Sequence, residues 1–264
     1  MNKTFDIKRF GNVLRHDALS YLQNFGWTLV VLLAIPILIW FILYINMDDI
    51  EAVVNYERYG FLLVLAIIAM ILAPSRLYKN ANDSRKGIQF AMLPASNLEK
   101  FLSMSIYCLV VTPILYLVGA VAIDCILTLI PGKNPYGGFV FRNIFHTNIM
   151  KVELNDDIFL MPLPFYQVFL LLSYVSIFMF TNMIFKKRKV SKTIGILALI
   201  GIIFMVIFIR VILYYESIYE YDIIPDDTQE ILVKCAYYGY YVFNIILTVA
   251  MLYLTYLKIR KQKY

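Results

Sequence analysis

Runs of about twenty apolar residues, almost free of charge, recur along this chain and limit what it can fold into. A helix rises about 1.5 Å per residue, so roughly twenty residues cross the hydrocarbon core of a bilayer, which is about 30 Å thick. Of the 264 residues, 61% are hydrophobic and 16% are charged, whereas soluble domains are roughly 45–50% apolar and about 25% charged. The sequence therefore predicts an all-α polytopic membrane protein, and it excludes soluble enzymes, disordered regulators and secreted disulfide scaffolds.

Six of these runs are long enough to cross a membrane, and we interpret residues 1–264 as one transmembrane domain with six spans. The second span is the least apolar. Its strictly apolar part, Gly60–Ala73, is short, so the stretch around Tyr56–Tyr59 has to complete the crossing. The predicted spans are residues 27–45, 53–73, 101–130, 164–185, 193–214 and 236–257.

Lys and Arg residues are unevenly divided between the segments that join the spans. Segments 1–26, 74–100, 186–192 and 258–264 carry 18 of the 24, whereas the alternate segments carry five. Acidic residues show the opposite bias. Because cytoplasmic loops are rich in Lys and Arg, we expect both termini in the cytoplasm and the protein in the plasma or inner membrane. Basic residues scattered in this way also argue against binding to nucleic acid.

The segment Phe5–Phe25 precedes the first span and has apolar residues at helical spacing. It predicts an amphipathic helix that lies in the cytoplasmic interface, with His16 on its polar side. The apolar positions are Phe10, Val13, Leu14, Ala18, Tyr21, Leu22 and Phe25, and the charged positions expected on other faces are Lys8, Arg9, Arg15 and Asp17.

Between the second and third spans lies the longest predicted cytoplasmic loop. Asp83 or Ser84 can cap a short helix that runs through Met92. Pro94 ends this helix, because the residue before a proline disfavours the helical conformation. Ser96 can then cap the next helix, with Glu99 at its third position completing a capping box.

A basic interface helix, two spans and a capped cytoplasmic helix that ends in Leu-Pro-Ala-Ser-x-Leu-Glu-Lys-Phe form a pattern that resembles the permease subunits of type-2 ABC transporters. The local motif covers fewer than ten residues, while the layout covers nearly the whole chain. The motif residues are Leu93, Pro94, Ala95, Ser96, Leu98, Glu99, Lys100 and Phe101.

The resemblance implies an exporter subunit that works as a homodimer or with a related permease and is driven by a separate cytoplasmic ATP-binding subunit. In that family the helix between spans two and three is a coupling helix, which docks into a groove of the ATPase. The ATPase-coupling residues implied here are Ser84, Arg85, Lys86, Ile88, Phe90, Leu93, Pro94 and Glu99.

The external side departs from the family pattern. Small re-entrant helices usually lie between spans five and six, but here that loop is acidic, and the larger external loop, 131–163, joins spans three and four. No gate residues are therefore carried over. A second function class stays open, in which the chain is a membrane scaffold or sensor whose basic loops recruit a cytoplasmic partner or anionic lipid.

The sequence contains neither the phosphate-binding motif GxxxxGK[ST] nor HExxH, and His16 and His146 lie on opposite sides of the predicted membrane. We therefore expect no catalytic, cofactor or metal site, and ATP hydrolysis on another chain. The three cysteines are interpreted as buried apolar side chains. They are Cys108, Cys125 and Cys235.

The loop 131–163 contains a turn-rich stretch, Pro131–Gly138, and the acidic stretch Asn155–Asp157. Its acidic residues suggest Ca²⁺ binding, but their spacing matches no EF-hand. We therefore expect a solvated loop.

Asp124 and Arg210 are the two ionisable residues that fall well inside the predicted spans, at similar depth near their external ends. Charges within a bilayer are costly and usually face a partner or a wet cavity. One hypothesis is that the two residues pair and join span three to span five. The alternative is that Arg210 reaches the outer head groups while Asp124 meets a hydroxyl group or water.

Overall fold

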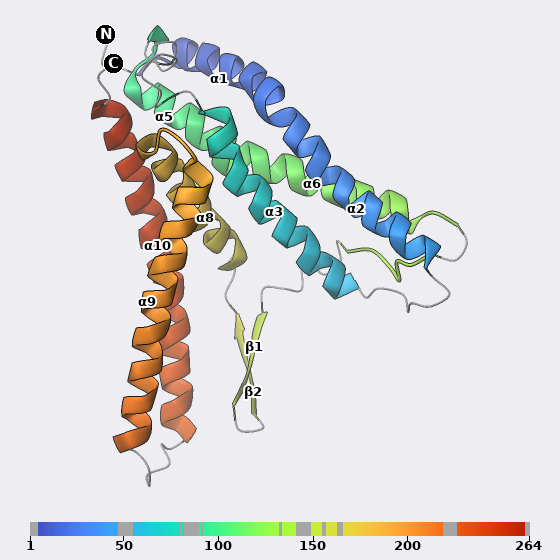
Figure 1. Cartoon of the computed structure of the whole chain (residues 1–264), viewed down its shortest axis with the longest axis vertical. Helices are drawn as coiled ribbons and strands as arrows, with labels where there is room; N and C mark the ends of the chain where they lie inside the picture. The colour runs from blue at the N-terminus through green and yellow to red at the C-terminus, as the bar shows by residue number, and fades with distance from the viewer. Residues whose placement is uncertain are drawn as a thin grey trace.

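The structure is a computed structural model that describes residues 5–46, 55–79, 81, 90, 92–131, 134–140, 149–154, 157–162, 166–218 and 226–261. Over these residues the chain forms helices and one β-hairpin, joined by short irregular segments such as residues 134–140 (Figure 1). The elements are α1 (Ile7–Tyr21), η1 (Leu22–Gly26), α2 (Trp27–Ile45), α3 (Asn55–Leu77), α5 (Asn97–Ile106), η2 (Tyr107–Val111), α6 (Thr112–Thr128), β1 (Ile149–Leu154), β2 (Asp157–Pro162), α8 (Tyr166–Ile184), α9 (Lys189–Ile218) and α10 (Asp226–Lys261).

Within the described residues, five helical stretches are long and apolar enough to cross a membrane. Val168–Ile184, where the fourth span is predicted, is apolar but shorter. These helices indicate a membrane protein, while the six-span count and the orientation stay predictions. The five stretches are Ile7–Ile45, Glu57–Leu77, Asn97–Thr128, Lys189–Ile207 and Tyr238–Lys261.

The predicted N-terminal helix is present as α1 and runs directly into α2 through the π-helical turn η1 (Figure 1). The Asp6 side chain caps it by accepting hydrogen bonds from the backbone N–H groups of Lys8 and Arg9. The prediction that Asp17 lies on an outward face is wrong, because Asp17 is buried on the same side as Val13 and Tyr21. Four-residue spacing places these three side chains on one face of the helix.

The helix α3 lies at the centre of the packing, between two clusters of buried side chains. It contributes Ala66, Ala69 and Ala73 to the first cluster, where α2 and α6 meet it around Tyr116. It contributes Met70 to the second cluster, which joins α5, η2, α8 and α10. Small residues let helix backbones approach closely in a membrane, so the alanine face of α3 suits this central position.

The start of α1 and the end of α10 lie at one end of the molecule, together with the start of α5 (Figure 1). We call this the terminal end and the opposite end of α2, α3 and α6 the loop end. The prediction of a solvated loop over 131–163 is wrong for residues 134–140, where Tyr136 and Val140 are buried. Further along this loop, β1 and β2 pair as an antiparallel hairpin, with Ile149 opposite Pro162 and Leu154 opposite Asp157. Residues 155 and 156 of the suggested Ca²⁺ site lie outside the described residues.

Candidate functional site

The predicted coupling segment is described only at its end. Ser84, Arg85, Lys86 and Ile88 lie outside the described residues, whereas Phe90 and residues 92–101 are described. The predicted capping box is confirmed. The Ser96 Oγ accepts a hydrogen bond from the Glu99 N–H at 3.2 Å, and the Glu99 carboxylate accepts one from the Ser96 N–H at 2.8 Å.

Glu99 also connects α5 to the start of α1, which the sequence did not indicate. Its Oε1 accepts hydrogen bonds from the Asp6 N–H at 2.8 Å and from the Arg9 Nη2 at 3.0 Å. The Glu99 side chain is fully buried, so each of these charge-assisted contacts replaces a contact with water. One carboxylate therefore fixes the cap of α5 and the N-terminal end of α1 together.

Asp17 forms a second buried contact between elements at the terminal end. Its Oδ2 accepts hydrogen bonds from the Tyr78 hydroxyl at 2.9 Å and from the Ser103 hydroxyl at 2.6 Å, and its Oδ1 lies 3.2 Å from the His16 Nδ1. Tyr78 directly follows α3. Burial, together with the neighbouring Asp17 charge, raises the pKa of Tyr78 well above its usual value, so the phenol stays a hydrogen-bond donor.

The backbone after α3 is held by side chains from two further helices. The Lys189 Nζ donates to the carbonyl oxygens of Lys79 at 2.9 Å and Tyr78 at 3.5 Å, and the Asn182 Nδ2 donates to Tyr78 at 3.4 Å. On the other side of the segment, the Lys100 Nζ donates to the Phe90 carbonyl at 2.8 Å. Residues 80–89 are thus preceded by Tyr78 and Lys79, which are held by α1, α8 and α9, and followed by Phe90, which is held by α5.

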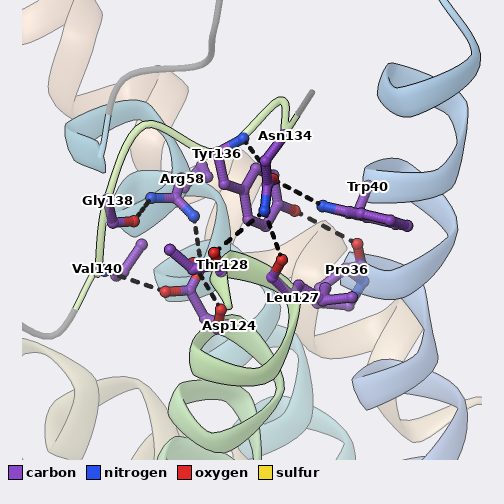
Figure 2. Close-up of polar contacts among 10 residues, drawn as sticks. All are labelled: Pro36, Trp40, Arg58, Asp124, Leu127, Thr128, Asn134, Tyr136, Gly138 and Val140. Atoms are coloured by element: carbon purple, nitrogen blue, oxygen red, sulfur yellow. Dashed lines mark hydrogen bonds and ion pairs between the residues drawn. The ribbon is translucent and has the colours of Figure 1, made fainter. Parts of the chain in front are cut away.

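At the loop end, a buried ion pair joins α3 to α6 (Figure 2). The Arg58 Nη1 lies 2.8 Å from the Asp124 Oδ1, and both side chains are buried. Arg58 also donates to the Gly138 carbonyl and lies 4.0 Å above the Tyr136 ring centre, while the Asp124 Oδ2 accepts a hydrogen bond from the Val140 N–H at 3.0 Å.

The hypothesis that Asp124 pairs with Arg210 is wrong, because the Asp124 carboxylate is bound by Arg58 and the Val140 N–H. Arg210 is exposed on α9, which lies well apart from α6 (Figure 1). By sequence, Arg58 was counted with the external segment before the apolar part of the predicted second span, 53–73, and was not considered as a partner of Asp124. In the structure α3 begins at Asn55, and Arg58 is a buried residue of its first turn.

Asn134 fixes the chain that follows α6 (Figure 2). Its Nδ2 donates to three carbonyl oxygens at the end of α6, those of Leu127, Thr128 and Ile130. Its Oδ1 accepts hydrogen bonds from the Trp40 Nε1 at 3.2 Å and the Tyr136 N–H at 3.0 Å. The last carbonyls of a helix lack intrahelical partners, so one amide both caps α6 and holds the loop against α2.

The Tyr136 side chain completes the closure of this end. It is buried, and its hydroxyl donates to the Pro36 carbonyl of α2 at 3.5 Å. Burial raises the pKa of Tyr136, with the Arg58 charge acting in the opposite direction, so the hydroxyl stays protonated as this contact requires. Residues 134–140 are therefore a packed cap over α2, α3 and α6, and not a solvated loop.

A pocket of about 250 Å³ lies under this cap, between α2, α3 and α6. Its walls are mainly apolar, with the Arg58–Asp124 pair and Tyr136 at one side and Glu57 at the surface. The lining residues are Pro36, Ile39, Leu43, Glu57, Arg58, Phe61, Leu62, Asp124, Leu127 and Tyr136.

The cysteines differ in exposure. Cys108 is buried as predicted, Cys125 is half-buried, and Cys235 is exposed on α10, against the prediction. Among the described residues, no group of three or more His, Cys, Asp or Glu side chains has a geometry that could hold a metal ion. Comparison of the chain with protein-family models, curated proteins and solved structures found no match.

Proposed function

We propose that this chain is the membrane-spanning permease subunit of an ATP-driven, ABC-type exporter. It works as a homodimer or with a related permease, and a separate cytoplasmic ATP-binding subunit contacts its segment 84–92. The proposal draws on the resemblance of the Leu93–Phe101 motif and on one structural observation, the anchoring of both sides of this segment.

The anchoring supports coupling because a displacement of the segment would be transmitted to several helices at once. Tyr78 and Lys79, on one side, are held by Asp17 of α1, Asn182 of α8 and Lys189 of α9. On the other side, the Glu99 carboxylate ties α5 to α1. Packed elements linked by buried polar contacts move together, so a displaced ATPase groove would shift the helices on both sides of the segment.

The test is purification of the tagged full-length chain from its native membrane, followed by identification of co-purifying nucleotide-binding proteins and measurement of ATP hydrolysis. Arg85→Glu/Lys86→Glu should remove the ATPase or its stimulation while membrane insertion stays normal, because an interface that complements two positive charges rejects two negative ones. Arg260→Glu/Lys261→Glu, an equal charge change at the exposed end of α10, is the matched control.

Retention of a fully active ATPase by the Arg85/Lys86 variant would contradict this coupling site. The alternative function, a membrane scaffold or sensor, is favoured by the exposed basic residues Lys186, Lys187 and Arg188. It predicts that the chain co-purifies with a partner that does not hydrolyse ATP. A Lys186→Ala/Lys187→Ala variant, which keeps Arg188 and Lys189, should then lose this partner.

A further inference from the structure

The pocket under the loop-end cap has the size and chemistry of a site for a hydrocarbon chain. Ile39 and Leu43, about one helical turn apart, line it from α2, Phe61 and Leu62 line it from α3, and Leu127 lines it from α6. Its volume of about 250 Å³ is just below the roughly 300–1,000 Å³ of pockets that hold drug-sized molecules. A single chain fits this space better than a whole two-chain lipid.

The charged residues beside the pocket do not make it a site for an ionic group. Arg58 and Asp124 neutralise each other at 2.8 Å, and both also bind the backbone of the cap, at Gly138 and Val140. Breaking such a buried pair to bind an outside charge is strongly unfavourable, because it leaves one charge uncompensated. Any charged part of a ligand must therefore stay at the surface.

Glu57 is the charged residue at the surface edge of the pocket. It is exposed and lies in the first turn of α3, beside Arg58, whose own charge is matched by Asp124. The segments predicted to be external, including the one with Glu57, hold 13 of the 18 acidic residues. A surface of one sign raises the local concentration of ligands of the opposite sign.

We propose that this pocket binds the hydrocarbon chain of an amphiphile whose cationic head group lies against Glu57. If this amphiphile is also a transported substrate, that part of the inference rests on the proposed exporter function. Binding itself needs no ATPase, so the two proposals can fail separately.

Trp40 provides a reporter inside the chain. It lies on α2 next to Ile39, and its indole is held by Asn134 of the cap. Trp27, the one other tryptophan of the sequence, is replaced by Phe, and the full-length chain is placed in bilayers of uncharged lipid. Quenching of Trp40 fluorescence is then titrated with a nitroxide-labelled long-chain alkylammonium and with the carboxylate of the same chain length.

We expect saturable quenching at a two- to fivefold lower concentration of the ammonium probe, the range that an exposed ion pair provides. Glu57→Gln should remove this preference, whereas Asp226→Asn, which removes an acidic residue at the start of α10, should retain it. Leu43→Phe fills the pocket and should weaken both probes about tenfold or more. Ile42→Phe adds the same ring on the exposed face of α2 and should leave the titration unchanged.

Equal quenching of the Leu43→Phe and Ile42→Phe variants would overturn the pocket, because Trp40 would then sense only bulk lipid. Ile39→Phe fills the same space one turn earlier and gives the same comparison if Leu43→Phe fails to fold. A third result is that both filling variants weaken the two probes, but the ammonium and carboxylate probes quench the unsubstituted chain equally and Glu57→Gln changes neither titration. The pocket would then bind hydrocarbon chains without regard to head-group charge, as it would bind a bilayer lipid chain. That result would overturn the cationic head group.

Discussion

The Arg58–Asp124 pair makes the sharpest prediction for single residues. Removal of one partner from a buried pair leaves a charge without compensation and costs about 3–5 kcal/mol. Asp124→Asn and Arg58→Gln should therefore each lower the thermal stability of the purified protein strongly, and the double variant should be no worse than the worse single variant. Arg210→Gln is the control and should have little effect, since Arg210 is exposed. Additive losses in the double variant would contradict the pairing.

Tyr78 and Tyr107 allow a matched test at the terminal end. The Tyr78 hydroxyl donates to the Asp17 carboxylate, whereas the Tyr107 hydroxyl donates to the uncharged Leu14 carbonyl. Hydrogen bonds to charged groups contribute about 1.5–3 kcal/mol and neutral ones about 0.5–1.5 kcal/mol. Tyr78→Phe should thus reduce the free energy of unfolding more than Tyr107→Phe in a denaturant titration. The reverse order would show that Asp17 is not anchored through Tyr78.

For single residues, the sequence predicted contacts correctly when the two partners are close together along the chain. Ser96 and Glu99 are three residues apart in one helical turn, so their reciprocal caps follow from spacing alone. Arg58 and Asp124 are 66 residues apart, and their contact depends on α3 starting early enough to include Arg58. The predicted second span, 53–73, already included Arg58, but which distant residue a side chain meets depends on how α3 and α6 pack, and helical spacing along the sequence does not give that packing.

The packing of α2 against α6 depends on one glycine. A Cβ atom at Gly119 would lie 2.8 Å from the Leu33 Cδ1 and 3.2 Å from its Cδ2. Gly119→Val should therefore displace the Leu33 side chain from its place between α2 and α6 and lower stability by about 1 kcal/mol, the low end of the usual cost of overpacking. Gly201→Val in α9, where nothing lies within 4 Å, is the control. Equal thermal stability of the two variants would show that α2 and α6 are not in close contact at Gly119.

The helices themselves were predictable because the mean hydropathy of about twenty residues changes little when one or two of them are polar. The predicted span 27–45 has the same bounds as α2, and helices occupy all six predicted spans in the described residues. The cap at 134–140 was not predictable, because its polar and turn-forming residues are also typical of a solvated loop. What distinguishes it is the set of carbonyl oxygens that α6 offers to Asn134, which appears only in three dimensions.

Topology is the prediction that concerns the whole molecule. The dense basic cluster Lys186–Lys189 lies on a very short loop and should hold it in the cytoplasm. In a variant without the native cysteines, a cysteine at Asn155 should react with an impermeant maleimide on intact cells, and one at Ser191 only after permeabilisation. The opposite pattern would invert the orientation, and labelling of both sites on intact cells would contradict the proposed span count between them.

Coupling across the whole molecule can be separated from simple docking by a variant that leaves segment 84–92 intact. Lys189→Met removes the donor to the Tyr78 and Lys79 carbonyls without changing any residue of the segment. We expect the ATP-binding subunit to remain bound while its transport-linked hydrolysis falls, because α9 is no longer tied to the chain that the ATPase moves. Lys192→Met, which removes an exposed charge one turn later in α9, should retain full activity. Loss of the ATPase from the Lys189→Met complex would instead make this lysine part of the docking surface, and unchanged hydrolysis would show that α9 is not on the coupling route.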